Sequence, residues 1–175
     1  IEIKNICFNY EDVKILKNIS FKINKGSHNI IIGANGSGKT TLAKHLNGLL
    51  IPDKGEVVVD GINTKKNSFE VRKKVGFVFQ NPEDQLVHSV VEEDIAFGLE
   101  NLNTPREEML RTVDTTLKKL NIVHLRNKNV NFLSAGQRQL VALSGVLAMN
   151  PDYIVLDEPT TFLDAKNKKN ILAII

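Results

Sequence analysis

One stretch of the sequence combines glycines, a lysine and two threonines at the spacing that binds a phosphate group. Residues 33–41 read Gly-Ala-Asn-Gly-Ser-Gly-Lys-Thr-Thr and fit the pattern G-x-x-x-x-G-K-[ST]. Glycines let the backbone turn tightly and point its N–H groups inward around an anion. In this pattern Lys39 reaches the β- and γ-phosphates of a nucleotide, and the Thr40 hydroxyl binds Mg²⁺. The predicted nucleotide contacts are Asn35, Gly36, Ser37, Gly38, Lys39, Thr40 and Thr41.

The elements on either side of this phosphate loop (residues 33–41) support nucleotide binding over an accidental glycine-rich turn. The run Asn29–Ile32 is short, apolar and β-branched, which predicts a buried parallel strand. Residues 41–50 place leucines at helical spacing, which predicts a helix that begins at the loop. The N-terminus of that helix would add its positive dipole end to the anion cradle.

Two acidic residues follow another apolar run. The segment 153–156 predicts a buried strand, and Asp157 and Glu158 stand at its carboxyl end. Parallel α/β sheets bind their ligands at that end of the strands. Beside a phosphate loop, Asp157 would hold Mg²⁺, and Glu158 would orient or deprotonate the attacking water. The alternative is a pair of solvated acids that simply end a strand.

Composition limits the classes of protein that fit. The chain has 175 residues, 42% hydrophobic and 25% charged, which suits one globular domain with a substantial core. Its net charge of +3 is too weak to argue for nucleic-acid binding. No stretch approaches the about 18 apolar residues of a membrane span. The single cysteine, Cys7, cannot form an internal disulfide, and we expect a cytosolic chain.

The remaining pattern predicts an α/β core with an antiparallel flap at its N-terminus. Alternating apolar residues predict strands over 1–10 and 19–23, followed by further strands at 56–60 and 75–79. The dipeptide Asp60-Gly61 predicts a tight turn after the third of these strands, and residues 68–74 predict a short helix.

The middle of the chain changes character. From residue 89 to about 130 the pattern is helical only, which predicts a helical subdomain inserted into the core, over about 85–148. Residues 104–107 read as a capping box with proline at the first helical position, starting a helix to about Lys119. Its predicted apolar stripe is Leu110, Val113, Leu117 and Leu120. The nucleotide-binding core would then comprise 1–80 and 150–175.

Residues 133–137, Leu-Ser-Ala-Gly-Gln, are the most diagnostic segment. Ser134 and Gln137 form a capping box that starts a helix running to about Asn150, and a cap could be their whole role. Along the chain, however, the phosphate loop is followed by this segment, then by an apolar strand and the Asp-Glu pair. In this order of motifs the chain resembles the ATP-binding-cassette (ABC) family of P-loop NTPases. That family's signature motif is LSGGQ. The resemblance implies that Ser134, Gly136 and Gln137 act on the ATP of a partner subunit across a dimer interface.

Other positions match the same family. Gln80, directly after the predicted strand 75–79, matches the Q-loop glutamine, which touches Mg²⁺ and senses the transmembrane partner. Asp164 matches the aspartate of the D-loop (here residues 161–164), which lies at the dimer seam. Tyr10 matches the aromatic residue that stacks on adenine, although a tyrosine at a strand end is as often simple packing. The resemblance implies Glu158, Lys39 and Gln80 as catalytic residues, with Mg²⁺ at Thr40, Gln80 and Asp157.

A narrower resemblance lies in residues 79–86 and 92–98. These segments look like the ATPase subunits of energy-coupling factor (ECF) transporters, which import vitamins or cobalt and nickel ions. Such subunits work in pairs, as homo- or heterodimers, beneath a membrane-embedded coupling protein and a substrate-binding membrane protein. The resemblance therefore implies an ATPase at the cytoplasmic face of the cell membrane. A non-transport ABC ATPase acting on the ribosome or DNA is the alternative, although no sustained heptads follow Gln80.

Three departures from the family pattern stand out. Ala135 replaces the first glycine of the signature, and Leu140 stands where the family often has arginine. The family also places a switch histidine after the strand that follows Glu158. The four histidines, at 28, 45, 88 and 124, all precede Asp157 and read as surface or packing residues. We therefore expect a chain truncated at its C-terminus, with hydrolysis by the chain alone in doubt.

Overall fold

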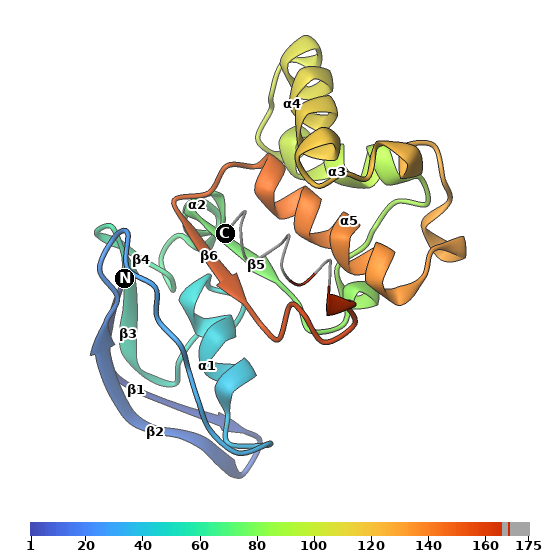
Figure 1. The fold of residues 1–175 in the computed structure, drawn as a ribbon. Coiled ribbons are helices and arrows are strands. Elements are labelled where there is room, and N and C mark those ends of the chain that lie inside the picture. The colour runs from blue at the N-terminus through green and yellow to red at the C-terminus, as the bar shows by residue number, and fades with distance from the viewer. Residues whose placement is uncertain (166–167, 169–175) are drawn as a thin grey trace. The chain divides into compact units, whose positions relative to one another are not determined.

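The computed structural model describes residues 1–165 and 168 (Figure 1). Contacts divide the chain into two compact units. The first unit comprises residues 1–77 and 152–155, and the second comprises 78–151 and, among the described residues that follow, 156–165 and 168. The predicted domain limits, at about 85 and 148, stay a prediction.

A four-stranded antiparallel sheet forms the base of the first unit. Its strands are β1 (Glu2–Tyr10), β2 (Val13–Lys22), β3 (Lys54–Val59) and β4 (Ile62–Asn63), in the order β2-β1-β3-β4. The inward positions of β1 and β3 bury Ile3, Ile6, Val57 and Val59. Asp60 and Gly61 have φ of 46° and 83°, as the predicted tight turn between β3 and β4 requires. The predicted flap is confirmed.

Two helices and a strand pair complete this part of the chain. Helix α1 (Lys39–Leu46) follows the phosphate loop, and α2 (Ser68–Lys74) has the predicted bounds. Strand β5 (Val75–Val78) pairs with β6 (Tyr153–Leu156). Polar contacts anchor the start of β6: the Tyr153 hydroxyl donates to Asp60 at 2.8 Å, and the Lys74 ammonium lies 3.1 Å from both Asp60 and Asp152.

The predicted buried strand at Asn29–Ile32 is wrong. These residues form no strand, and the side chains of Ile30 and Ile32 are 84% and 89% exposed. An apolar run becomes a buried strand only when neighbouring strands pair with its edges and other elements cover its faces. No strand among the described residues pairs with this run. Strand β6 is likewise half-buried rather than buried, since β5 is its only paired strand in residues 1–165.

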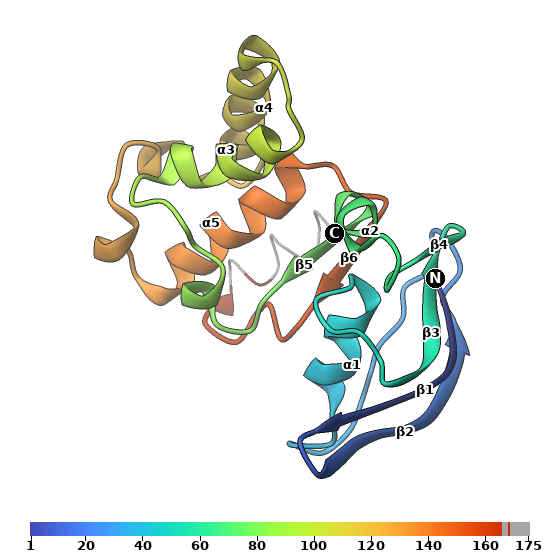
Figure 2. The same cartoon turned by 180° about the vertical axis from the view of Figure 1, so that it is seen from behind.

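The second unit is mostly helical (Figure 2). Its helices are α3 (Val91–Asn101), α4 (Arg106–Lys119) and α5 (Ala135–Ala148), with single 3-10 turns η1 (Pro82–Asp84), η2 (Val123–Leu125) and η3 (Val130–Phe132). Helix α3 packs against both α5 and α4. As predicted, residues 89–130 contain no strand, apart from an isolated bridge between Val90 and Asn129.

The start of α4 differs from the prediction. The expected capping box at Thr104 does not form, because Pro105 is itself the N-cap residue and has no side-chain oxygen to accept from the first turn. In the predicted apolar stripe, Val113, Leu117 and Leu120 are buried, whereas Leu110 is 56% exposed. No helix in the described part of the chain has the length and apolar character needed to cross a membrane.

Candidate active site

The phosphate loop lies in the first unit and depends on glycine at two positions. Gly36 and Gly38 have φ of 76° and 92°, in the left-handed region that L side chains rarely adopt. A Cβ on Gly38 would also lie 2.9 Å from Cγ2 of Ile15. Gly38 is the N-cap of α1 and supplies no side-chain cap, so the first N–H groups of the helix remain available to an anion.

Lys39 folds its side chain back over the loop. Its Nζ donates to the carbonyl oxygens of Gly33 and Ala34, at 3.0 Å each. The first turn of α1 carries no acidic residue, so nothing there offsets the positive charge of Lys39 and the helix dipole. The loop therefore combines a cation with free backbone donors, which suits the phosphates of a nucleotide.

Tyr10, the predicted adenine contact, ends β1 and is 46% exposed. Its ring meets that of Phe8 edge-to-face, with centroids 5.0 Å apart. Phe8 in turn packs edge-to-face on His45 of α1, with centroids 4.7 Å apart. Packing fixes one side of the tyrosine ring and leaves an exposed aromatic surface, so stacking on adenine stays a prediction.

The second unit brings two of the predicted catalytic residues together. The Gln80 side-chain Nε2 donates to Oε2 of Glu158 at 3.0 Å, and the Thr161 hydroxyl donates to the same oxygen at 3.3 Å. Glu158 is exposed, and its backbone adopts a φ of 47°. Non-glycine residues seldom adopt this conformation, which clusters at functional sites. Asp157, directly before it, is buried, and its N–H donates to the Val78 carbonyl at 3.0 Å.

The predicted capping box at the start of α5 is confirmed. Ser134 Oγ accepts from the Gln137 N–H at 3.3 Å, and the Gln137 side chain accepts from the Ser134 N–H at 3.0 Å. The same turn approaches the D-loop closely, because a Cβ on Gly136 would lie 2.9 Å from the Phe162 carbonyl oxygen. The N-terminus of α5 and the segment that leads to Asp164 therefore form one surface.

Two glutamines in this unit were missed by the sequence reasoning. Gln85 Oε1 accepts from the Phe79 N–H at 3.1 Å, and Gln139 Nε2 donates to the Phe79 carbonyl at 3.4 Å. Gln139 is 1% exposed. The sequence did contain one signal for Gln139. It lies four residues before Leu143 in a predicted helix, and therefore on the apolar face, where a buried polar side chain needs a hydrogen-bond partner. Gln85 carried no such signal.

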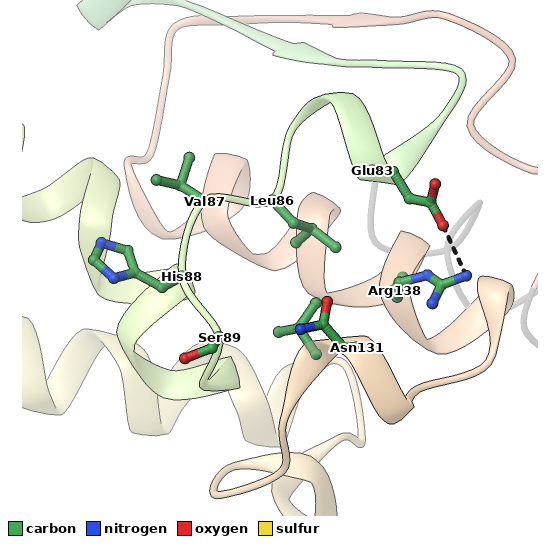
Figure 3. Close-up of a pocket in the computed structure, with 8 residues that line it drawn as sticks. Glu83, Leu86, Val87, His88, Ser89, Asn131 and Arg138 are labelled. Atoms are coloured by element: carbon green, nitrogen blue, oxygen red, sulfur yellow. Dashed lines mark ion pairs between the residues drawn. The ribbon is translucent and has the colours of Figure 1, made fainter.

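A pocket of about 530 Å³ opens beside the segment that follows Gln80 (Figure 3). Its charged wall is the ion pair between Arg138 and Glu83, 3.1 Å apart, and Leu86 and Val87 add apolar surface. Asp94 of α3 fixes part of the wall, because its Oδ1 accepts from the N–H groups of Val87 and His88 at 2.7 and 2.9 Å. The other lining residues are His88, Ser89, Val130 and Asn131.

The predicted metal ligands belong to different units. Thr40 lies in the first unit, whereas Gln80 and Asp157 lie in the second, so their use as one Mg²⁺ site stays a prediction. A hydroxyl, an amide oxygen and a carboxylate are the oxygen donors that Mg²⁺ prefers. Because Gln80 faces Glu158 through its amide nitrogen, its oxygen remains available as a ligand. The residues present fit both ATP and Mg²⁺ chemically.

Comparison with known proteins gives consistent matches along the chain. A family model described as ABC transporter matches residues 16–161. The energy-coupling factor transporter ATP-binding protein EcfA1 of Enterococcus faecalis is 46% identical over 179 residues, which cover 100% of this chain and 64% of the relative. This chain thus spans a little under two thirds of that relative.

Two solved structures share the fold. The structure of cbiO1 from Clostridium perfringens, described as part of the ABC transporter complex cbiONQ, aligns with a TM-score of 0.83 at 37% identity. It covers 99% of this chain and 70% of its own. The ATP-binding cassette MJ0796, described as a dimer in a post-hydrolysis state with ADP and Pi bound, aligns with a TM-score of 0.88 at 30% identity. The alignment covers 99% of this chain and 80% of the MJ0796 chain.

Proposed function

Because this chain belongs to the ABC transporter family, as an ATP-binding protein of that family, we propose that it hydrolyses ATP to energise import of a small solute through a membrane transporter of the ECF type. The solute class is a vitamin or a transition-metal ion. Similarity to EcfA1 and to cbiO1 supports the transporter type, since the first is described as an energy-coupling factor transporter protein and the second as part of an ABC transporter complex.

The observation that carries the proposal is the hydrogen bond between Gln80 and Glu158. It joins the residue expected to sense the membrane partner to the residue expected to handle the attacking water, at 3.0 Å. An amide that contacts both a carboxylate base and a partner-facing loop can make hydrolysis depend on the partner. A general base placed in this way contributes about 10²- to 10⁴-fold to the rate.

The first unit would bind the nucleotide. Lys39 and the backbone N–H groups of the phosphate loop would hold the phosphates, and Tyr10 would stack on the adenine. Mg²⁺ at Thr40, Gln80 and Asp157 would neutralise charge that develops on the phosphates. Glu158 would orient the water and accept its proton. Catalysis would then consist mainly of positioning and charge stabilisation.

A second copy or a sister subunit would complete the site. The surface formed by Ser134, Gly136 and Gln137, together with Asp164, would face the ATP bound by the partner subunit. The dimeric state described for MJ0796 supports this arrangement. The pocket beside Gln80 would receive the cytoplasmic part of a transmembrane coupling protein, because its wall begins three residues after the glutamine that touches Glu158. The subunit would thus lie at the cytoplasmic face of the membrane.

Co-purification tests the proposal. The intact protein is extracted from native membranes in detergent, isolated by an affinity tag, and its partners are identified by mass spectrometry. We expect an integral-membrane coupling protein, a second cassette ATPase and a small membrane-embedded substrate binder. Recovery with ribosomal or DNA-bound proteins only, and absence from the membrane fraction, would overturn the transport assignment and leave ATP hydrolysis to be measured separately.

A further inference from the structure

The peptide groups around Phe79, the residue directly before Gln80, are held by two side-chain amides. Gln85 Oε1 accepts from the Phe79 N–H at 3.1 Å, and Gln139 Nε2 donates to the Phe79 carbonyl at 3.4 Å. Gln85 also donates from its Nε2 to the Ala142 carbonyl of α5 at 2.8 Å. Both polar groups of the Phe79 backbone are therefore tied to α5, one directly and one through Gln85.

The burial of Gln139 calls for an explanation. The residue is 1% exposed, and its Oε1 is buried without a hydrogen-bond partner in the described part of the chain. Burying an amide oxygen without a partner destabilises the fold, and an apolar residue of similar size would avoid that cost. The useful contact of the side chain is the one its Nε2 makes with Phe79. That contact fixes the backbone at the point where β5 ends and Gln80 begins.

We propose that Gln139 is a positioning residue for ATP hydrolysis, which holds Gln80 against Glu158 through the backbone of Phe79. The inference rests on the proposed function. Gln85 assists from the other side of the same residue. Gln139 lies five residues after Ser134 on one continuous helix. The N-terminus of α5 would face the partner subunit's ATP. Through Gln139 and the Phe79 backbone, the same helix is linked to Gln80, whose amide contacts Glu158.

Steady-state kinetics of the intact transporter assembly tests the first consequence. Gln139→Leu removes the donor to Phe79, and Gln85→Met removes the acceptor. We expect kcat to fall roughly ten- to a hundred-fold in each, since small displacements of a positioned group have effects of that order. The KM for MgATP should stay close to that of the wild type, because the phosphate loop is unchanged.

Ser144→Ala is the matched control. Ser144 is fully buried in the same helix, and its hydroxyl donates to the Leu140 carbonyl at 2.7 Å. The Ser144→Ala variant removes a buried side-chain hydrogen bond from α5. It leaves unchanged the proposed clamp, which is the pair of hydrogen bonds that Gln85 and Gln139 make with the Phe79 backbone, so kcat should remain near the wild-type value. An equal loss of kcat in Ser144→Ala would show that general weakening of α5 explains the result, and would overturn the positioning role.

A double variant separates positioning from a purely structural role. If Gln139 acts through Gln80, Gln80→Ala combined with Gln139→Leu should be no slower than Gln80→Ala alone. Independent contributions would instead multiply, and that outcome would overturn the proposal.

Amide hydrogen exchange gives a readout that needs no activity. The Phe79 N–H should exchange several-fold faster in Gln85→Met, and the segment 79–85 should exchange faster in Gln139→Leu, while Ser144→Ala should match the wild type. Unchanged exchange in both clamp variants would overturn the clamp itself. If the wild-type protein hydrolysed no ATP but the two variants still showed these exchange differences from it, the proposed function would be refuted. The hydrogen bonds of Gln85 and Gln139 to Phe79 would remain established.

Discussion

The side-chain amide of Gln80 donates to the carboxylate of Glu158 at 3.0 Å, although the two residues stand 78 positions apart in the sequence. The Thr161 hydroxyl donates to the same carboxylate oxygen at 3.3 Å. Two donors on one oxygen fix the direction in which the Glu158 carboxylate points. They come from the segment after β5 and from the D-loop, so displacement of either segment would move the base.

Glu158→Gln should stop hydrolysis and keep nucleotide binding. An amide cannot accept the proton of the attacking water, so kcat should fall by about 10²- to 10⁴-fold. The phosphate loop is untouched, and ATP affinity should therefore change little. Because ATP then persists at the site, the closed dimer should accumulate. Phosphate release measures the rate, a fluorescent ATP analogue measures affinity, and size-exclusion chromatography measures dimerisation.

Glu100→Gln is the control for this variant, since it removes an exposed carboxylate from α3, outside the candidate site. It should hydrolyse ATP as the wild type does. If Glu158→Gln also kept the wild-type rate, Glu158 would not be the base.

Lys39→Ala should abolish nucleotide binding. The ammonium group is the one side-chain cation of the phosphate loop, and alanine leaves only backbone donors to hold the β- and γ-phosphates. Titration with a fluorescent ATP analogue should show no saturable binding. Lys66→Ala, which removes the same charge from an exposed site in the first unit, should bind normally. Retained affinity in Lys39→Ala would refute the proposed phosphate site.

Local signals in the sequence were enough to predict most elements. The bounds of α2, the capping box of Ser134 and Gln137, and the turn at Asp60 follow from propensities and short-range hydrogen bonds that a sequence pattern records directly. The α4 start was wrong by one residue, because Pro105 rather than Thr104 takes the N-cap position. Helix ends are where such patterns are least decisive.

Long-range relationships were not predictable in the same way. The apolar run Asn29–Ile32 has strand composition, yet its burial depends on partners that composition does not specify. The Q-loop and Asp-Glu motifs were each found, but only the structure joins Gln80 to Glu158. The bond between Gln139 and Phe79 spans 60 positions and follows from helix packing, which no local pattern encodes.

Gly136→Ala should destabilise the second unit. The added methyl group would lie 2.9 Å from the Phe162 carbonyl oxygen, which belongs to the backbone and cannot rotate away. Overpacking of this kind typically costs about 1–3 kcal/mol. Chemical denaturation should report the loss, and ATP hydrolysis should fall with it because the D-loop must shift.

Gly145→Ala provides the matched control in the same helix. Its nearest neighbour outside the helix would be the Asp94 carbonyl oxygen at 3.8 Å, an ordinary contact. Alanine is the better helix former by about 1 kcal/mol, so this variant should be as stable as the wild type or more stable. A stable, fully active Gly136→Ala variant would contradict the close approach between α5 and the D-loop.

His45 should make the stability of the first unit depend on pH. Its ring is fully buried in α1, Nδ1 lies 2.7 Å from the Thr41 carbonyl, and Nε2 has no partner among the described residues. Burial lowers the pKa of His45, because the charged imidazolium loses its hydration. Below the unfolded value of about 6.5, the unfolded chain therefore binds a proton that the folded chain resists. Stability is fully present above that pH and falls as the pH drops toward the lowered pKa.

Replacing His45 with leucine should remove this dependence. Urea denaturation between pH 7.5 and 5 should show the wild type losing stability on acidification, with a slope of at most about 1.4 kcal/mol per pH unit from this group. As the pH falls across that range, the free energy of unfolding of His45→Leu should rise relative to that of the wild type. His28→Ala, at an exposed position, should keep the wild-type slope. A parallel pH dependence in His45→Leu would show that other groups titrate in this range, and that burial of His45 does not set the acid sensitivity.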